Sequence, residues 1–217
     1  MRLVIGNKNY SSWSLRPWLF MRHHGIAFEE VRLPLDTDAY RERIGSLSPT
    51  GRVPVLHDGD RIVWDSLAIL EYLADLHPEL GGWPRDEGAR ALARCIAAEM
   101  HSGFADLRSG LPMNCTRTCS LHAISAGARR DIERVQAVWS QARQAYGHDG
   151  PFLFGRFGIA DAMYAPVAIR FRGYGVPLDA TAQAYVEALY ALPAMREWLA
   201  GAAAESERLA KYDHIGL

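Results

Sequence analysis

Residues 48–78, SPTGRVPVLHDGDRIVWDSLAILEYLADLHP, predict a strand, a tight turn, a second strand and a helix. Two short apolar runs at 53–56 and 61–64 flank an Asp-Gly pair, which is a strong signal for a β-hairpin. Apolar residues then recur at helical spacing until His77-Pro78 ends the pattern, and the repeating positions are Leu67, Leu70, Leu73 and Leu76. We therefore expect a hairpin at the edge of a sheet, followed by a helix that packs on that sheet.

Two positions in this stretch indicate a binding site as well as structure. Proline cannot donate a hydrogen bond to a neighbouring strand, so Pro54 belongs at a strand edge or a bend. A cis Val53-Pro54 bond would turn the backbone groups of Val53 outward, where a ligand can pair with them like an added strand. Ser66 is expected to cap the following helix, whose first N–H groups would then face a small anion. The alternative is a plain hairpin edge followed by an ordinary helix cap.

Composition and charge exclude several classes of protein. The chain has 217 residues, a net charge of −1 and a sequence pI near 6.7, so it lacks the basic field of proteins that bind nucleic acid or anionic membranes. No apolar run approaches the roughly 20 residues that a membrane helix needs, and RLVIG at the N-terminus leads directly into a predicted strand. Three cysteines are no disulfide framework and fit a reducing compartment. We therefore expect a soluble, cytoplasmic protein without a nucleic-acid or membrane partner.

The rest of the pattern divides into a mixed α/β part and an all-helical part. A strand at 2–5, a helix capped by Ser14 and a strand at 28–33 form a βαβ unit, and a weak helix at 38–44 leads into the hairpin. Two glycines and a proline in LGGWP at 80–84 then interrupt the periodicity. Helical apolar stripes follow at 89–107, 132–142, 159–171, 185–190 and 194–203. We predict an α/β domain at 1–78, a linker at 79–86 and an all-α domain at 87–217.

Three motifs give the chain a resemblance to a known family, the cytosolic glutathione transferases. VPVL at 53–56 followed by DSLAILEYL at 65–73 resembles that family's Val-Pro-x-Leu and Glu/Asp-Ser-x-Ala-Ile-x-x-Tyr-Leu pattern. FLFGRFGIADAMYAPV at 152–167 is similar to the Ser/Thr-x-Ala-Asp start of the family's buried helix, with Gly158 in place of the capping hydroxyl. SSWSLRPWL at 11–19 is similar to the start of the first helix in serine-type members.

The resemblance implies a fold and an activity. It implies a thioredoxin-like N-terminal domain followed by an all-helical C-terminal domain, assembled as a cytosolic homodimer. It also implies a detoxification enzyme, a glutathione S-transferase that joins the thiolate of glutathione to a small hydrophobic electrophile. One alternative is a glutathione-dependent isomerase of the maleylacetoacetate type, whose Ser-Ser-Cys-Ser-Trp-Arg run is only partly matched by SSWSLR. The other is a non-catalytic glutathione-transferase-like module for binding or protein interaction.

The serine-type motif also implies a catalytic hydroxyl. In that motif the serine precedes the arginine by five residues, which corresponds to Ser11 here. Ser12 lies one position away, and Tyr10 is a further alternative because other classes of the family use a tyrosine near this place. No cysteine occurs in residues 6–12. The subclasses that react through an active-site thiol are therefore disfavoured.

The resemblance places both substrates. The glutathione-binding residues that it implies are Arg52, Val53, Pro54, Asp65 and Ser66. Of these, Asp65 would pair with the γ-glutamyl ammonium group, Ser66 would bind the carboxylate, and the backbone of Val53 would bind the cysteinyl part. The electrophile would lie between the domains, and its candidate contacts are Trp13, His101, Phe104, Arg108 and Met113. Phe104 also continues an apolar stripe, so core packing explains it equally well.

Two further features of the sequence resemble functional sites, but we expect neither to bind a metal or a substrate. Cys115, Cys119 and His122 have a spacing that suggests a metal site, but a fourth ligand is missing nearby, so we predict that the protein needs no metal. Asp161 stands at the third position of the predicted buried helix, where its carboxylate can bond back to the cap at Gly158. We therefore expect Asp161 to stabilise the fold without binding a substrate.

Overall fold

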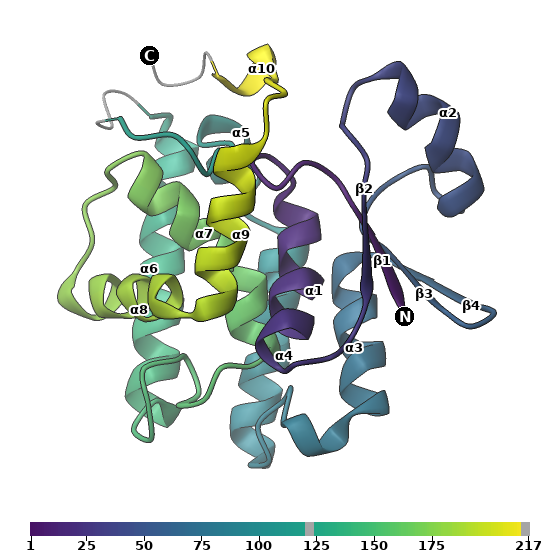
Figure 1. The fold of residues 1–217 in the computed structure, drawn as a ribbon. Coiled ribbons are helices and arrows are strands. Elements are labelled where there is room, and N and C mark those ends of the chain that lie inside the picture. Colours follow the sequence, from purple (N-terminus) through teal and green to yellow (C-terminus); the bar gives the residue numbers. More distant parts are fainter. Residues whose placement is uncertain (120–123, 214–217) are drawn as a thin grey trace.

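A four-stranded sheet forms the centre of the N-terminal part of the chain. A computed structural model describes residues 1–119 and 124–213 (Figure 1). The elements up to residue 76 are β1 (Arg2–Ile5), α1 (Ser12–His23), β2 (Glu29–Arg32), α2 (Asp38–Leu47), β3 (Val55–Asp58), β4 (Arg61–Trp64) and α3 (Ser66–Leu76). The sheet order is β2-β1-β3-β4, with β1 parallel to β2 and antiparallel to β3. The predicted βαβ unit and hairpin are therefore confirmed.

Alternating side chains of the sheet face two separate layers of helix. Leu3, Ile5 and Leu56 point into the main core, where α1 and α3 cover the sheet. Val4 and Val55 point to the opposite face and form a small second cluster with Ile44 of α2. This alternation follows from the two-residue period of a strand. It leaves α1 and α3 on the face that meets the helical part of the chain (Figure 1).

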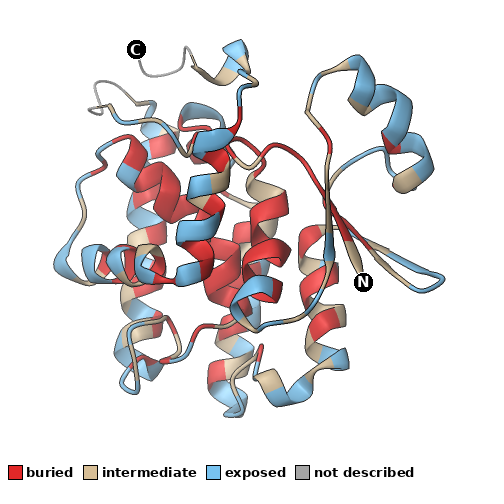
Figure 2. Ribbon diagram, in the orientation of Figure 1, coloured by how far each residue is buried: buried red, intermediate tan, exposed pale blue. Residues whose placement is uncertain are grey.

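The rest of the described chain is helical. It comprises the 3₁₀ turn η1 (Pro78–Leu80) and the helices α4 (Glu87–Ser102), α5 (Ala105–Gly110), α6 (Ala126–Tyr146), α7 (Ile159–Gly173), α8 (Ala180–Ala191), α9 (Pro193–Ala204) and α10 (Ala210–Asp213). The uniformly apolar pattern at 159–171 belongs to α7, which is buried along almost its whole length (Figure 2). One apolar core crosses from α1 into α7 and α9, and within it the rings of Trp18 and Trp198 lie 5.1 Å apart. None of the described helices is both long and apolar enough to span a membrane.

Three local expectations are wrong. The stripe at 89–107 is two helices, because the chain turns at Gly103, where a Cβ would lie only 2.7 Å from the carbonyl oxygen of Glu99. Ser14 does not cap α1: the helix begins at Ser12, and the Ser14 hydroxyl instead accepts a hydrogen bond from the Gly6 N–H at 3.1 Å. Asp65, and not Ser66, is the N-cap of α3.

The interaction expected of Asp161 is present. One oxygen of its buried carboxylate accepts from the Gly158 N–H at 2.9 Å, and the other accepts from the Leu153 N–H and the Tyr185 hydroxyl, each at 3.0 Å. Burial nevertheless raises the pKa of Asp161 to about 6. Asp161 thus joins the start of α7 to the preceding loop and to α8.

Candidate active site

Ser11 lies in a tight turn directly before α1. Its backbone N–H donates to the carbonyl of Asn7 at 2.8 Å, and its hydroxyl donates to the Ser14 oxygen at 2.7 Å. The side chain is almost completely buried, whereas Ser12 is half-buried. Because Ser11 is the N-cap residue of α1, its hydroxyl lies at the positive end of the helix dipole. This environment favours an anion beside Ser11.

The hydroxyl of Tyr10 is bound to the other end of the chain. It donates to the carboxylate of Asp213, with oxygen distances of 3.0 and 3.2 Å, and accepts from the Leu209 N–H at 3.3 Å. Burial is the largest cause of a raised pKa for this phenol. Tyr10 therefore fixes the segment at residues 209–213, and its hydroxyl is engaged by that segment.

The peptide bond between Val53 and Pro54 is cis, as the sequence suggested. Pro54 is buried just before β3, and no backbone hydrogen bond joins Val53 to another described residue. The turn is held from the other side by Ser48, whose hydroxyl accepts from the Arg52 N–H at 3.2 Å and donates to the Arg52 carbonyl at 2.7 Å. The Arg52 side chain is exposed. The backbone of Val53 thus keeps its hydrogen-bonding capacity for a ligand.

Asp65 and Ser66 form the N-terminus of α3. Asp65 has φ 77°, and one of its carboxylate oxygens accepts from the N–H groups of Leu67 and Ala68. The other oxygen lies 3.3 Å from Nε2 of His101 at the end of α4. The Ser66 side chain is buried and accepts from Nη1 of Arg16 at 3.1 Å. Two elements of the α/β part and one of the helical part therefore meet at this helix end.

Arg16 lies beside these candidate residues, and it was not singled out from the sequence. Its guanidinium is buried, its Nε atom has no hydrogen-bond partner among the described residues, and none of their ion pairs includes it. Burial lowers the pKa of Arg16 to about 9, and the positive charges of Arg170 and Arg108 act in the same direction. A buried cation without a bonded carboxylate is costly, so this place is suited to an anionic ligand. Its position in the SSWSLR motif was the available signal.

Trp13 lies beside residues that the sequence suggested for the electrophile site. The guanidinium carbon of Arg16 lies 4.3 Å from its ring centre and that of Arg108 lies 4.7 Å from it, both within cation–π range. The His101 ring meets Trp13 edge-on at 5.3 Å. Trp13, His101 and Arg108 are thus brought together, as the sequence suggested. Phe104 and Met113 are instead 7% and 2% exposed, and both belong to the main core.

No group of potential metal ligands occurs among the residues that the structure describes. Cys115 donates from its Sγ to the carbonyl of Lys8 at 3.3 Å, and burial raises the pKa of its thiol to about 12. A metal ligand needs the thiolate form, which this environment disfavours. His122, the third residue of the suspected spacing, lies outside the described residues.

Comparison with known proteins identifies the family. Residues 10–76 match the model of the glutathione S-transferase N-terminal domain, and residues 125–201 match that of the C-terminal domain. Glutathione S-transferase 1 from Dianthus caryophyllus is 30% identical over 182 residues, which cover 82% of this chain and 80% of that protein. The chain belongs to the glutathione S-transferase family. Its four-stranded sheet with α1 to α3 is the thioredoxin-like domain of that family, and the helices from α4 onward are its all-helical domain.

A second relative has a different name. A probable maleylacetoacetate isomerase from Caenorhabditis elegans is 29% identical over 98 residues, which is 45% of this chain and 45% of that protein. The match therefore spans less than half the length of that relative. The relatives of this chain thus include proteins that are named as transferases and as isomerases.

Solved structures share the fold over nearly the whole chain. A glutathione transferase homologue from Burkholderia with bound glutathione has a TM-score of 0.70 at 24% identity, covering 94% of this chain and 98% of that one. Maleyl pyruvate isomerase, described as a bacterial zeta-class glutathione S-transferase, has a TM-score of 0.73 at 22% identity, covering 95% and 100%. At these identities the likeness establishes the fold alone.

Proposed function

We propose that this glutathione S-transferase family member binds glutathione at the N-termini of α1 and α3 and ionises its thiol with the help of Ser11. The observation that carries the proposal is the buried guanidinium of Arg16 beside Ser66, which has no carboxylate bonded to it. A ligand carboxylate there would accept from the hydroxyl and the backbone N–H of Ser66 and from Arg16, since the N–H groups of Leu67 and Ala68 already donate to Asp65. The γ-glutamyl group of glutathione supplies such a carboxylate.

We assign the remaining polar groups of glutathione to partners in the same region. The γ-glutamyl ammonium would pair with Asp65, whose second oxygen faces His101. The cysteinyl part would pair with the backbone of Val53, which lies before β3 and has no backbone hydrogen bond to another described residue. Arg52 is exposed beside this turn, where it would meet the glycyl carboxylate at the rim of the site. Each assignment joins opposite charges or a donor to an acceptor.

The energy needed to ionise the thiol is within reach of this site. A free thiol has a pKa of about 8.5, so only a few per cent is thiolate at neutral pH. Lowering that pKa by about two units requires roughly 2.7 kcal/mol. A hydroxyl that donates to the thiolate supplies on the order of 1.5–3 kcal/mol, and the N-terminus of α1 adds about 0.3–1 kcal/mol. The Ser11 hydroxyl, once turned from Ser14 to the sulfur, is therefore sufficient without a metal.

The electrophile would bind against Trp13, and we propose a small hydrophobic compound as the first candidate. Its reaction joins the thiolate sulfur to the electrophilic carbon and displaces a leaving group or saturates a double bond. Trp13 would supply an apolar wall, and His101 and Arg108, which contact its ring, would reach the electrophile from the helical domain. Phe104 and Met113 would act only from behind this wall, because both are buried in the core.

A second candidate function is favoured by the positive charge around Trp13. Arg16 and Arg108 both contact its ring, and the positive charges of Arg170 and Arg108 both act on Arg16. Such a pocket favours an electrophile that carries carboxylates, as the substrate of a maleylacetoacetate isomerase does. A coupled isomerase assay beside a conjugation assay with a neutral aryl halide would distinguish the two functions. A non-catalytic module would accelerate neither reaction.

The experiment that tests the common part of these functions is a glutathione titration of the pure protein, in which ultraviolet thiolate absorbance is followed against pH. We expect a saturable signal with an apparent pKa near neutrality. Binding without a thiolate signal would favour the non-catalytic module, and no binding would refute the proposal. We also propose that the protein acts in the cytoplasm, in detoxification, as a homodimer and without a metal, because the family resemblance implies these properties.

A further inference from the structure

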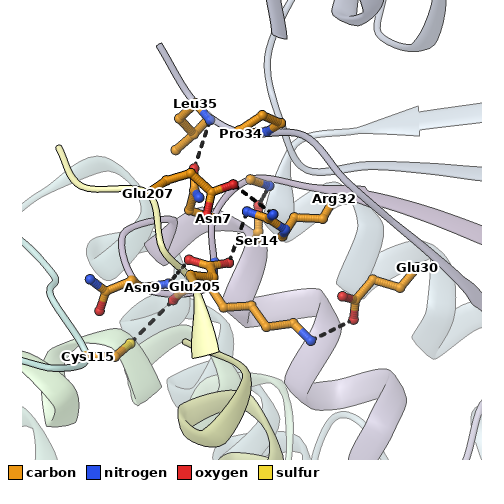
Figure 3. A network of polar contacts seen from close by, with 12 residues as sticks. Asn7, Asn9, Ser14, Glu30, Arg32, Pro34, Leu35, Cys115, Glu205 and Glu207 are labelled. Atoms are coloured by element: carbon orange, nitrogen blue, oxygen red, sulfur yellow. Dashed lines mark hydrogen bonds and ion pairs between the residues drawn. The ribbon is translucent and has the colours of Figure 1, made fainter. Parts of the chain in front are cut away.

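The segment that follows α9 returns to the loop that precedes Ser11. Glu205 is the first residue after α9, and its side chain is buried. One carboxylate oxygen accepts from the Lys8 N–H at 2.7 Å, and the other accepts from the Asn9 N–H at 3.1 Å (Figure 3). A single side chain from the end of the helical domain thus binds two successive backbone groups of the N-terminal domain.

The charge of Glu205 is balanced locally. Nη1 of Arg32 lies 3.5 Å from the Glu205 carboxylate, and Nη2 of the same side chain bonds to Glu207 at 2.8 Å. The Lys8 ammonium points elsewhere: it pairs with Glu30 at 2.9 Å and lies over the Trp18 ring. Glu205 therefore holds the loop through the backbone of Lys8 and not through its side chain. Hydrogen bonds from N–H groups to a carboxylate are about twice as strong as neutral ones.

The two bound N–H groups lie inside the turn that sets the place of Ser11. Asn7 begins this turn, and its carbonyl accepts from the N–H groups of Tyr10 at 3.2 Å and Ser11 at 2.8 Å. Lys8 and Asn9 lie between Asn7 and Tyr10, so any displacement of their backbone is passed to Ser11 through these bonds. The strength of a hydrogen bond falls steeply as its length and angle depart from the optimum. A small shift of the turn would therefore weaken a bond from the Ser11 hydroxyl to a ligand.

We propose that Glu205 is a positioning residue, which holds the turn at residues 7–11 so that the Ser11 hydroxyl reaches the sulfur of bound glutathione. The inference rests on the proposed function, because it requires that Ser11 bind the thiolate. Glu205 acts through the backbone of Lys8 and Asn9, and it does not itself contact the substrate. The helical domain thereby contributes to thiol activation as well as to the electrophile pocket.

The decisive variant is Glu205→Gln, with Glu207→Gln as its matched control. Glutamine keeps one accepting oxygen but presents an amide NH₂ to the second N–H, so the turn loses one of its two bonds. Glu207 shares the contact with Arg32 but has no bond to the turn. The readout is the thiolate absorbance of bound glutathione against pH, together with the affinity for S-methylglutathione, which cannot ionise. Melting temperatures report any general loss of stability.

We expect Glu205→Gln to lower the ratio of bound thiolate to thiol by about three- to tenfold, which is a rise of about 0.5 to 1 unit in the apparent pKa of bound glutathione. The affinity for S-methylglutathione should stay within about twofold, because this ligand cannot ionise and so does not depend on the Ser11 hydroxyl. A twofold change is well under one tenfold step in affinity. Glu207→Gln should leave both quantities unchanged. In a Ser11→Ala background Glu205→Gln should have no further effect on the thiolate, because the two residues act in one chain of contacts.

Other results would overturn the inference. A lower melting temperature with an unchanged thiolate ratio would make Glu205 a purely structural residue. Equal shifts in both glutamine variants, or an undiminished shift in the Ser11→Ala background, would show that Glu205 acts by charge and not through Ser11. If Glu205→Gln does not fold, Glu205→Asp retains the charge but shortens the reach, and it should show a smaller shift of the same sign. No thiolate signal in the unaltered protein would refute the proposed function itself.

Discussion

Nη1 of Arg16 lies 3.1 Å from the hydroxyl oxygen of Ser66, so the first and third helices of the sheet domain meet through one buried hydrogen bond. Each residue belongs to a different motif of the sequence, SSWSLR and DSLAILEYL. Arg16 would bring a positive charge to a helix end that already favours anions. The bond therefore joins the part of the site that would hold the carboxylate of glutathione to the helix that follows Ser11.

Replacing Arg16 should separate binding from stability. We expect Arg16→Met to weaken glutathione binding by tenfold or more, because a charge-assisted hydrogen bond contributes about 1.5–3 kcal/mol. The ligand-free protein should melt no lower than before, since a buried, unpaired charge is removed and its methylene volume is kept. Calorimetric titration measures the affinity for glutathione, and thermal melts measure the stability of the ligand-free protein. Arg22→Met is the control on the same helix, because Arg22 is half-exposed and paired with Glu197. Unchanged binding with a strongly lowered melting temperature would contradict the assignment.

Parallel variants of the three hydroxyl residues test the catalytic assignment. Ser11→Ala should lower kcat/KM at neutral pH by about 10- to 100-fold, the equivalent of the 1.5–3 kcal/mol that a hydrogen bond to a charged group supplies. Ser12→Ala should change it little. Tyr10→Phe should mainly reduce stability, because the Tyr10 hydroxyl binds Asp213 and the Leu209 N–H. If only Tyr10→Phe abolished the thiolate signal, the assignment of Ser11 would be wrong.

Much of this arrangement was predictable from the sequence, because local signals and long-range packing agree. The hairpin at 55–64 and the buried helix α7 each follow from a short pattern, whereas the cis bond before Pro54 was only one of the arrangements that the sequence left open. The helix break at Gly103 could not be predicted, because the apolar stripe continues across it. Only the close approach of the Glu99 carbonyl requires glycine there. Serine and aspartate are both common N-cap residues. Whether Ser11 or Ser14 caps α1, and whether Asp65 or Ser66 caps α3, therefore depends on the path of the folded chain.

The missed parts of the site depend on contacts between distant residues. Arg16 reads as an ordinary helix residue until the fold buries it against Ser66. Glu205 reads as a polar residue after a helix, and its bonds to Lys8 and Asn9 cross 197 and 196 residues of sequence. No hydrophobic periodicity or motif around Glu205 predicts a contact with the N-terminal domain. Buried charge is a property of the folded protein and has to be observed there.

Asp161→Ala should destabilise the protein without a specific loss of glutathione affinity. The variant leaves the N–H groups of Leu153 and Gly158 and the Tyr185 hydroxyl without their buried acceptor. We expect a loss of about 2–4 kcal/mol, which corresponds to a fall of roughly 4–16 °C in Tm for a chain of this size. Asp179→Ala, at the cap of α8, is the control and should cost only about 1 kcal/mol. An affinity loss at unchanged stability would contradict a structural role.

His24 should make the protein acid-sensitive between about pH 6.5 and 4. Burial, with a smaller contribution from His23, lowers the pKa of His24 to about 4 from its ordinary 6.5. In this window the unfolded chain binds the proton more readily, so stability is complete above pH 6.5 and is lost as the pH falls toward 4. The loss should be on the order of 1 kcal/mol, because the ring is only half-buried. Because the raised pKa of Asp161 acts on stability in the opposite direction over the same range, the His24 contribution is the difference in pH dependence between the unaltered protein and His24→Phe, each unfolded in urea at pH 7.5 and 5.0.

The variant His24→Phe keeps an aromatic ring against Phe20 and Phe157 but cannot titrate. It should flatten this part of the pH dependence and leave a smaller slope from His23, whose pKa burial also lowers. His148→Gln, an exposed position, should leave the slope unchanged. A steeper loss of stability in His24→Phe than in the unaltered protein would refute the account.

If the protein forms the proposed homodimer, the edge strand β4 should be part of its interface. Ile62 and Trp64 are 43% and 47% exposed on the same face of this strand, which is an unusual exposure for large apolar side chains on a sheet edge. We expect a dimer by sedimentation equilibrium, and Trp64→Glu should weaken it by at least tenfold, because a carboxylate buried in an interface is costly. Tyr146→Glu, at an exposed aromatic residue on α6, is the matched control and should remain dimeric. A Trp64→Glu protein that dimerises as before would place the interface on another face, and a monomeric unaltered protein would refute the dimer itself.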